Sequence, residues 1–336
     1  YVDLDRSEDL LEIYRGQIDL SAEVDKKLDY LFRTVDLLRD RLGRPEDAIP
    51  PAEEALALSP GNLGAIQRLD ELFTVTERWG DLGTTLEDTS RLVDADKARV
   101  VVLKNRLALI YEQPLERPET AIEIHASVLQ MEPENAASVE ALERLFENGD
   151  LAPSIAPILQ PYYEKKNDWQ RLIDVYAVRE EAANDVREKV DWHYRSAVLY
   201  EIEGQQPEMA FSQYEAAANL EPGNERTLNE LLRLTDTLDN HGELILFLQS
   251  IVEDIPSVER RIATHRTIAL LARDKTHDVP GAEKQFRAIL DIDPGDMPAT
   301  DALIALYRDK QDYSNLVDML LRKAPMRGVS VEERNG

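Results

Sequence analysis

Residues 118–135 read PETAIEIHASVLQMEPEN, a stretch that opens and closes near a proline and spaces its apolar residues like a helix. Three other stretches share this layout: residues 45–62, 207–224 and 280–296. Their closing prolines are Pro60, Pro133, Pro222 and Pro294, at intervals of 73, 89 and 72 residues. A proline suits the first turn of a helix, and a later proline ends one, so each stretch predicts a helix of about three turns.

Each stretch has a small residue twelve positions before its closing proline and mostly apolar residues eight and five positions before it. These sets are Ala48, Ala52 and Ala55; Ala121, His125 and Val128; Ala210, Tyr214 and Ala217; and Ala282, Phe286 and Ile289. The preceding segment carries a second pair, which is Val35–Leu38, Ala108–Tyr111, Ala197–Tyr200 or Ala269–Ala272. A small residue lets two helix backbones approach closely. This pattern resembles the tetratricopeptide repeat, a hairpin of two helices. The Asn or Asp after each closing proline is predicted to cap the next helix.

Weaker copies separate the four good ones, which explains a period near 72 residues. Apolar residues recur at helical spacing after each closing proline, but the small residue of the family pattern is missing there. The longer second interval predicts an additional helix near residues 151–168, bent or ended by Pro157 and Pro161. Pro50 and Pro51 predict a late or kinked helix in the first copy.

The resemblance implies an all-α fold: a right-handed α-solenoid superhelix of stacked antiparallel helix hairpins, with about 17 or 18 helices and no significant sheet. Helical hairpins bury their apolar faces by stacking on their neighbours. We expect an N-terminal helix or partial repeat over residues 1–21, the solenoid over 22–323 and a frayed tail over 324–336.

Composition excludes several classes of function. The chain has no cysteine, which removes disulfides, thiolate metal sites and a cysteine nucleophile. Its net charge of −27 would repel nucleic acid, and its apolar runs are too short to span a membrane. The five histidines are scattered, and no nucleotide-binding, hydrolase or metalloprotease motif is present. We therefore expect no enzyme, no catalytic residue, no metal and no cofactor.

Negative charge is concentrated in two stretches. Residues 111–150 hold ten acidic and two basic side chains, and residues 201–254 hold twelve and two. One interpretation is a solvated surface that keeps the chain soluble. The other is an acidic band that attracts a basic partner.

The repeat frame also proposes residues for a partner-binding groove along the first helix of each hairpin. These are Asp29, Asp36, Asn105, Glu112, Asp191, Tyr194, Glu201 and Arg266. Some tetratricopeptide proteins grip acidic peptide ends with Lys, Asn and Arg in this groove. Only Asn105 with Lys104 and Arg106 is similar here, so binding of that kind is not expected.

The favoured function is a non-enzymatic protein-interaction scaffold that presents an extended acidic surface to a partner protein or peptide, with a basic partner expected. A structural spacer within a longer solenoid is one alternative, and a helical-repeat enzyme or RNA-processing factor is another. The apolar faces of the terminal helices suggest self-association. The first residue is Tyr1 rather than methionine, which suggests a fragment. Localisation is therefore open, with the cytoplasm slightly favoured and an upstream signal compatible with the sequence.

Overall fold

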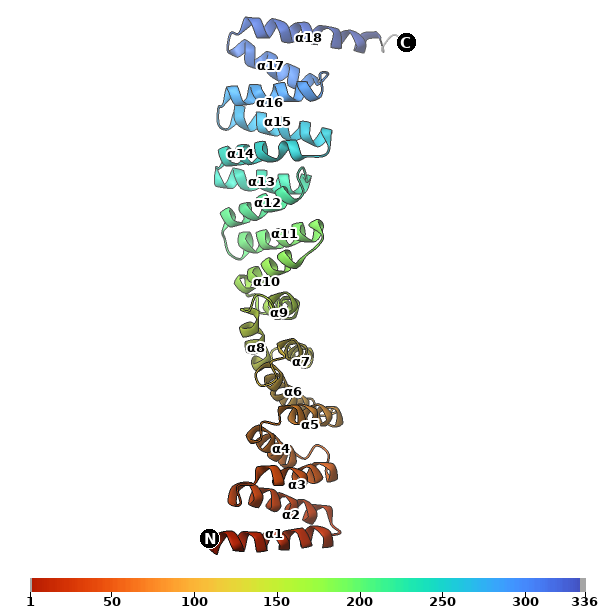
Figure 1. Ribbon diagram of the computed structural model, residues 1–336. Helices are drawn as coiled ribbons and strands as arrows, with labels where there is room; N and C mark the ends of the chain where they lie inside the picture. The colour runs from red at the N-terminus through yellow and green to blue at the C-terminus, as the bar shows by residue number, and fades with distance from the viewer. Residues whose placement is uncertain (1, 333–336) are drawn as a thin grey trace. The chain divides into compact units, whose positions relative to one another are not determined.

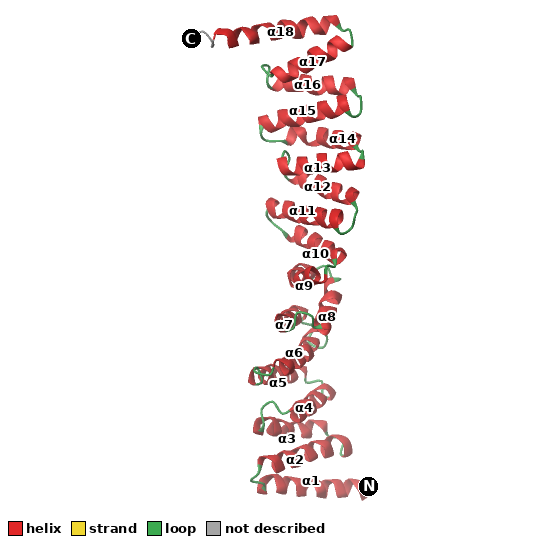
Figure 2. Cartoon of the chain, turned by 180° about the vertical axis from the view of Figure 1, so that it is seen from behind, coloured by secondary structure: helices red, strands yellow, loops and turns green. Residues whose placement is uncertain are grey.

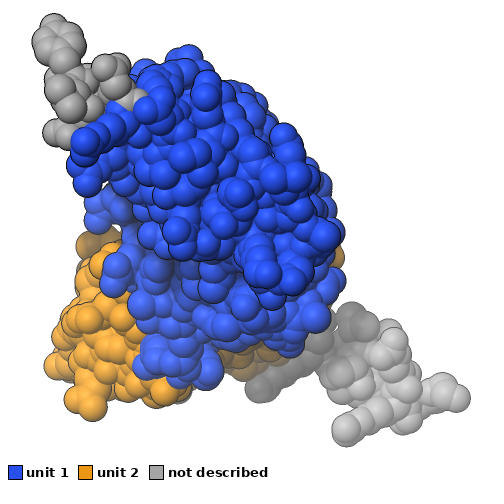
Figure 3. Space-filling model, turned by 90° about the horizontal axis from the view of Figure 1, so that it is seen from below, with its two compact units in different colours: residues 1–166 blue, residues 167–336 orange. Residues whose placement is uncertain are grey.

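The computed structural model describes residues 2–332, and over this range the chain is built from helices and connecting turns, with no strand. It forms two compact units, residues 1–166 and 167–336, which Figure 3 colours blue and orange. The eighteen α-helices of the described range confirm the predicted all-α repeat fold and its helix count. The handedness of the superhelix stays a prediction.

The first unit contains nine α-helices (Figure 1): α1 (Val2–Leu20), α2 (Val24–Asp36), α3 (Pro45–Leu58), α4 (Leu63–Val75), α5 (Trp79–Leu92), α6 (Lys97–Glu112), α7 (Pro118–Met131), α8 (Ala136–Phe146) and α9 (Ala152–Lys166). A π-helical turn, Leu37–Arg41, follows α2 directly. Each helix packs against the next one along the chain, so the unit is a stack of antiparallel hairpins (Figure 2).

The second unit contains the other nine: α10 (Trp169–Ala182), α11 (Val186–Ile202), α12 (Pro207–Leu220), α13 (Glu225–Leu238), α14 (His241–Ile251), α15 (Val258–Asp274), α16 (Val279–Ile292), α17 (Met297–Asp309) and α18 (Tyr313–Glu332). A short 3₁₀ turn, Val252–Asp254, follows α14. The good copies of the repeat are the pairs α2–α3, α6–α7, α11–α12 and α15–α16, and each contains one of the four stretches described above.

The corners of the repeat form as predicted. The residue two positions after each closing proline caps the next helix: Asn62 begins α4, Asn135 begins α8, Asn224 begins α13 and Asp296 begins α17. In each case the side-chain oxygen accepts a hydrogen bond from a backbone N–H of the first turn, which would otherwise have no partner.

Small side chains fill the hairpin interfaces. Ala197 of α11 and Ala210 and Ala217 of α12 are fully buried, and Tyr214 packs beside them with its ring edge toward Tyr194, 5.2 Å between centroids. Because alanine leaves little space between two backbones, the paired helices approach closely and the larger ring occupies the remaining volume. The predicted pattern of small and bulky residues therefore lies in the core of this hairpin.

The additional helix lies where the longer interval places it. After the weak first helices α4 and α13, a single helix (α5 or α14) precedes the next good copy. After α8, two helices, α9 and α10, precede the next good copy, which begins with α11. The boundary between the two units falls between these two helices.

The interior prolines neither end nor delay their helices, which were two of the predicted outcomes, and a bend or kink at them stays a prediction. Pro157 and Pro161 lie within a continuous α9, and α3 begins at Pro45 and continues through Pro50 and Pro51 to Leu58. The ring of Pro50 is exposed, while Ile49 and Ala52 beside it are buried, so packing of the inner face offsets the lost backbone hydrogen bonds.

One other expectation, at the C-terminus, differs from the structure, and one at the N-terminus is close to it. Helix α18 continues to Glu332, where a frayed tail was predicted from residue 324, and residues 333–336 lie outside the described range. Helix α1 ends at Leu20, and the separate N-terminal helix was expected to end at residue 21.

Candidate functional site

The eight predicted groove residues all lie on the first helices of good copies. Asp29 and Asp36 are on α2, Asn105 and Glu112 on α6, Asp191, Tyr194 and Glu201 on α11, and Arg266 on α15. Most of them are occupied by contacts inside the stack. Only Asp29 and Asp191 are exposed and paired solely along their own helices, with Arg33 and Arg195.

In the second and third copies, an ion pair joins the first helix to the weak first helix that follows it, 32 residues further along the chain. Glu112 of α6 accepts from Arg144 of α8 at 2.6 and 2.7 Å, and Glu201 of α11 accepts from Arg233 of α13 at 2.7 and 2.6 Å. Glu201 and Arg233 form two parallel hydrogen bonds, the bidentate arrangement that adds specificity and strength, whereas Nη2 of Arg144 alone contacts both oxygens of Glu112. Two predicted groove residues therefore bind neighbouring helices.

The first copy forms the same bridge with its charges reversed. Arg39 stands at the repeat position of Glu112 and Glu201, and its partner Glu71 stands at the position of Arg144 and Arg233. A further pair, Asp36 with Arg68, lies beside it, with oxygen–nitrogen distances of 2.9 and 2.8 Å. Three copies therefore place opposite charges at these two positions, in either polarity, whereas the fourth has Arg273 and Ala305 there and Arg273 pairs with Asp274 instead.

Asn105 belongs to a hydrogen-bonded chain that crosses three helices. The Ser138 hydroxyl donates to Asn105 Oδ1 at 3.0 Å and contacts His125 Nδ1 at 3.0 Å, and Asn105 Nδ2 donates to the capping Asn135. Because Ser138 donates to Asn105, His125 Nδ1 is the donor to Ser138. Burial lowers the pKa of His125, which keeps its ring neutral near pH 7 and leaves Nε2 as an unpaired acceptor.

Tyr194 and Arg266 occupy the repeat position of Asn105 and make equivalent contacts. Tyr194 is buried, its hydroxyl pairs with Thr227 at 2.8 Å, and burial raises its pKa. Arg266 Nη2 donates to the capping carboxylate of Asp296 at 2.6 Å. Because Tyr194 is 5% exposed, its side chain offers little surface to a partner, and its role in a groove stays a prediction.

The fragment that resembles a carboxylate-binding clamp is also used internally. Arg106 pairs with Asp70 at distances of 2.6 to 3.1 Å, and Lys104 donates to Ser127 at 2.8 Å. Both cations are therefore already hydrogen-bonded within the stack.

We expect a charge swap to reveal the role of these bridges. Arg144→Glu alone should lower the free energy of unfolding by about 1–2 kcal/mol, because it places two carboxylates together at a half-buried contact. Adding Glu112→Arg should restore most of this loss, reproducing the polarity of the first copy. A double-mutant cycle by urea unfolding measures the coupling, and the same swap of Asp29 with Arg33 is the control. Equal coupling in both cycles would mean that the bridge between helices has no special weight.

The surface formed by the first helices of the hairpins has a feature that was not predicted. A cleft lies between two of these helices, and an equivalent cleft occurs at the same repeat position in the other unit. In the first unit it lies between α4 and α6, encloses about 330 Å³ and is lined by Leu63, Ala98, Arg99, Val102, Leu103 and Asp96. Leu63 and Val102 are 57% and 67% exposed. The sequence contains a signal for it, since these residues are apolar at outward-facing helical positions.

The second unit has the equivalent cleft between α13 and α15, with a volume of about 470 Å³. Its lining includes Leu228, Leu232, Ala263 and Arg260, and Arg260 stands at the repeat position of Arg99. The first cleft is mostly aliphatic, which is the usual composition of a site for a peptide side chain, whereas the second is more polar, with Glu225 at the repeat position of Leu63 and Glu259 beside Arg260.

The acidic stretches are partly neutralised within their own units. Glu134 lies between Lys165 and Lys166 at 2.7 and 2.8 Å, and these hydrogen bonds lower its pKa to about 2. Glu112 and Glu201 are paired as described above. Others, such as Glu119 and Glu123 of α7, remain exposed.

Residues 2–332 contain no helix with both the length and the apolar character needed to cross a membrane. In the same part of the chain, no three His, Cys, Asp or Glu side chains are grouped so that they would hold a metal ion.

No family model and no curated protein matches the sequence. Among solved structures, the chain is similar to the TPR domain of P58(IPK), at 13% identity and a TM-score of 0.28, covering 94% of this chain and 92% of that one. It is similar to part of a TPR repeat-containing protein from Cytophaga hutchinsonii, at 14% identity and a TM-score of 0.28, with coverages of 81% and 99%. It is also similar to yeast Tom70, at 10% identity and a TM-score of 0.29, with coverages of 99% and 87%. The helix hairpins, capped corners and alanine-lined interfaces of this chain form a tetratricopeptide-like helical repeat.

Proposed function

We propose that the chain is a non-enzymatic scaffold that binds a partner protein or peptide along the first-helix faces of its repeats. The observation that carries this proposal is the recurrence of one cleft at the same repeat position in both units, between α4 and α6 and between α13 and α15. Exposed aliphatic side chains of this kind lose contact with water when a partner binds, which favours association.

The chemistry of the first cleft favours a polypeptide segment with an apolar side chain as its anchor. Leu63 and Val102 supply the apolar contact in the first unit, and Arg99 lies beside them. The net charge of −27 attracts a basic partner at a distance and increases the rate of encounter. Apolar anchoring and long-range attraction therefore act at different stages of binding.

Affinity capture with the whole chain as bait, followed by elution in rising salt and mass spectrometry, tests this proposal. A matched pair of bait variants gives the test its specificity. Val102→Asp with Leu63→Asp alters the cleft, whereas Leu246→Asp alters an exposed leucine of α14 outside either cleft. We expect a partner retained by the wild type and by Leu246→Asp but lost by the cleft variant.

Two results would contradict the proposal. Retention of every partner by the cleft variant would remove the cleft from the binding surface. An empty eluate after gentle crosslinking would favour the spacer function instead, in which most of the surface is inert.

A further inference from the structure

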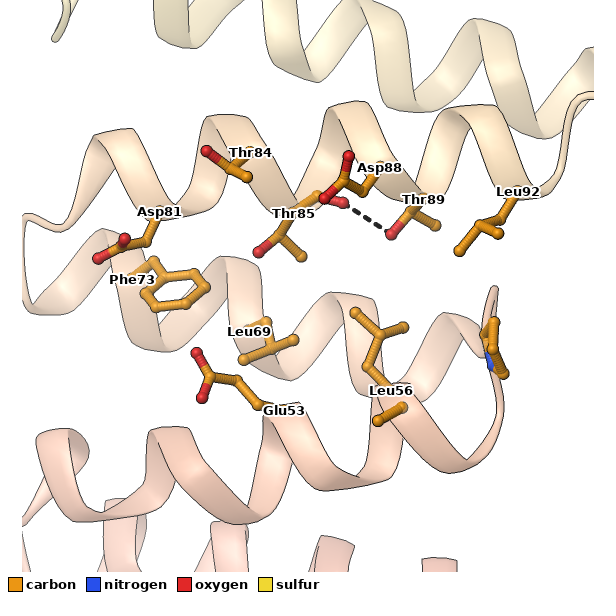
Figure 4. A pocket seen from close by; sticks show the side chains of 12 residues that line it. Glu53, Leu56, Leu69, Phe73, Asp81, Thr84, Thr85, Asp88, Thr89 and Leu92 are labelled. Atoms are coloured by element: carbon orange, nitrogen blue, oxygen red, sulfur yellow. Dashed lines mark hydrogen bonds between the residues drawn. The ribbon is translucent and has the colours of Figure 1, made fainter.

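A different cleft lies on the side of the first unit formed by the second helices. It runs between α3 and α5, over α4, and encloses about 390 Å³ (Figure 4). Leu56 of α3 and Leu92 of α5 give it an apolar surface, and Leu92 is exposed. Its volume admits a few side chains of a docked segment.

Three carboxylates line this cleft, and no lysine, arginine or histidine does. Glu53 extends from α3, while Asp81 and Asp88 extend from α5 (Figure 4). Glu53 forms no ion pair among the described residues. Asp81 and Asp88 pair with Arg78 and Arg91 of the same chain segment, and such exposed pairs contribute little and exchange easily. The cleft is therefore apolar inside and negatively charged at its edge.

The fourth copy of the repeat fills the same place with its own cations. Arg287 of α16 stands at the repeat position of Glu53, and Arg322 of α18 stands at that of Asp88. Arg287 lies over the ring of Tyr307 at 5.7 Å and donates to Asn315 at 3.3 Å. Arg322 donates to the backbone oxygens of Leu290 and Pro294 at 3.3 Å.

The residues that Arg287 and Arg322 contact in the fourth copy correspond to residues that line the open cleft in the first copy. Asn315 corresponds to Asp81, Leu290 to Leu56 and Pro294 to Pro60, and all three counterparts line the space between α3 and α5. The repeat geometry thus accepts guanidinium groups at this site, and the first copy offers carboxylates there instead.

The third copy has carboxylates at two of the same positions. Glu215 of α12 corresponds to Glu53, and Glu243 of α14 corresponds to Asp81. Burial, with a smaller contribution from the charge of Glu243, raises the pKa of Glu215. The charges of these two carboxylates repel one another, and a bound cation would relieve that repulsion.

We propose that the cleft between α3 and α5 docks a segment of a partner protein that carries two arginine or lysine side chains flanking an apolar one. Glu53, Asp81 and Asp88 pair with the cations, and Leu56 and Leu92 contact the apolar group. Asp81 and Asp88 are seven residues apart, about 10 Å along the helix, so cations at positions i and i+7 of a helical segment match them. This inference rests on the proposed function and assigns it a second surface and a partner chemistry.

The test uses a defined peptide and the whole chain. The probe is a 14-residue amidated peptide with arginines at positions 4 and 11, leucines at 7 and 8, and alanine and glutamine elsewhere. Its control replaces both arginines by citrulline, which keeps the shape and removes the charge. Affinity is measured by fluorescence anisotropy at 50 and 150 mM salt, and the site is located by hydrogen exchange.

A matched pair of protein variants separates the cleft from general attraction. Glu53→Gln with Asp81→Asn and Asp88→Asn removes three charges from the cleft, and Glu116→Gln with Glu119→Gln and Glu123→Gln removes three exposed charges from the first unit elsewhere. We expect the cleft variant to weaken binding at least about tenfold and the other less than about threefold. Circular dichroism checks that both variants fold.

Equal weakening by the two variants, or equal affinity of the arginine and citrulline peptides, would overturn this inference. So would protection of amides outside α3–α5. Failure here is distinguishable from failure of the proposed function, because a captured partner lost only by Val102→Asp with Leu63→Asp would leave the scaffold function standing without this cleft.

Discussion

Phe286→Ala should lower the free energy of unfolding of the second unit by about 3–5 kcal/mol, the largest effect that we expect from a single substitution. Phe286 is 2% exposed and lies in the core of the last repeats, at the bulky position that pairs with the small Ala282. Removing the ring leaves a cavity between helices that are fixed by their other contacts, so neighbouring side chains can collapse into it only in part.

Urea unfolding followed by circular dichroism measures this loss, and hydrogen exchange shows where it occurs. Each repeat contacts only its neighbours, so the amides of α15–α17 should lose protection while those of α2–α4 keep theirs. Leu246→Ala, at a leucine that is 69% exposed on α14, is the control and should cost less than about 0.5 kcal/mol. A small loss from Phe286→Ala would mean that the hairpin core is not formed by the predicted pattern.

Much of this fold is predictable because the residues that begin and end its helices act on their immediate neighbours in the sequence. Pro45, Pro118 and Pro207 each begin a second helix as expected, because a first-turn proline lacks an N–H that the helix does not use. Asn135 and Asp296 cap the next helices for the same kind of reason, since a short acceptor reaches the free N–H groups. These effects act within a few residues, so the sequence displays them directly.

Long-range pairing accounts for most of what sequence reasoning missed at the candidate site. Glu112 and Glu201 appear available in a helix pattern, yet each binds an arginine 32 residues away. The relevant signal was the reversed pair Arg39 and Glu71 at the same repeat positions, which becomes visible only when the weak copies are aligned with the good ones. The burial of Tyr194 was not predicted, because the periodicity of a helix does not show which of its faces contacts the next helix.

Gly223→Ala should destabilise the second unit by about 2–3 kcal/mol. Gly223 follows the closing proline of the third copy with a φ of +80°, a conformation that costs an ordinary residue about 1 kcal/mol or more. A Cβ there would also lie 2.7 Å from Cγ2 of Ile255, which is fully buried and has little freedom to move. Backbone strain and overpacking therefore add at this one position.

The fourth copy provides the matched control, Gly295→Ala, at the same repeat position. Gly295 does not have a left-handed φ, and the nearest atom to an added Cβ is Asp293 Oδ1 at 3.3 Å. This change should be close to neutral or slightly stabilising, because alanine restricts the unfolded chain. Glu134 already occupies the position in the second copy without a positive φ, which shows that the corner itself tolerates a side chain. Urea unfolding of both variants measures the difference in the free energy of unfolding. Equal losses would mean that any side chain at this corner is destabilising, and that the contact with Ile255 and the left-handed backbone of Gly223 are not the cause.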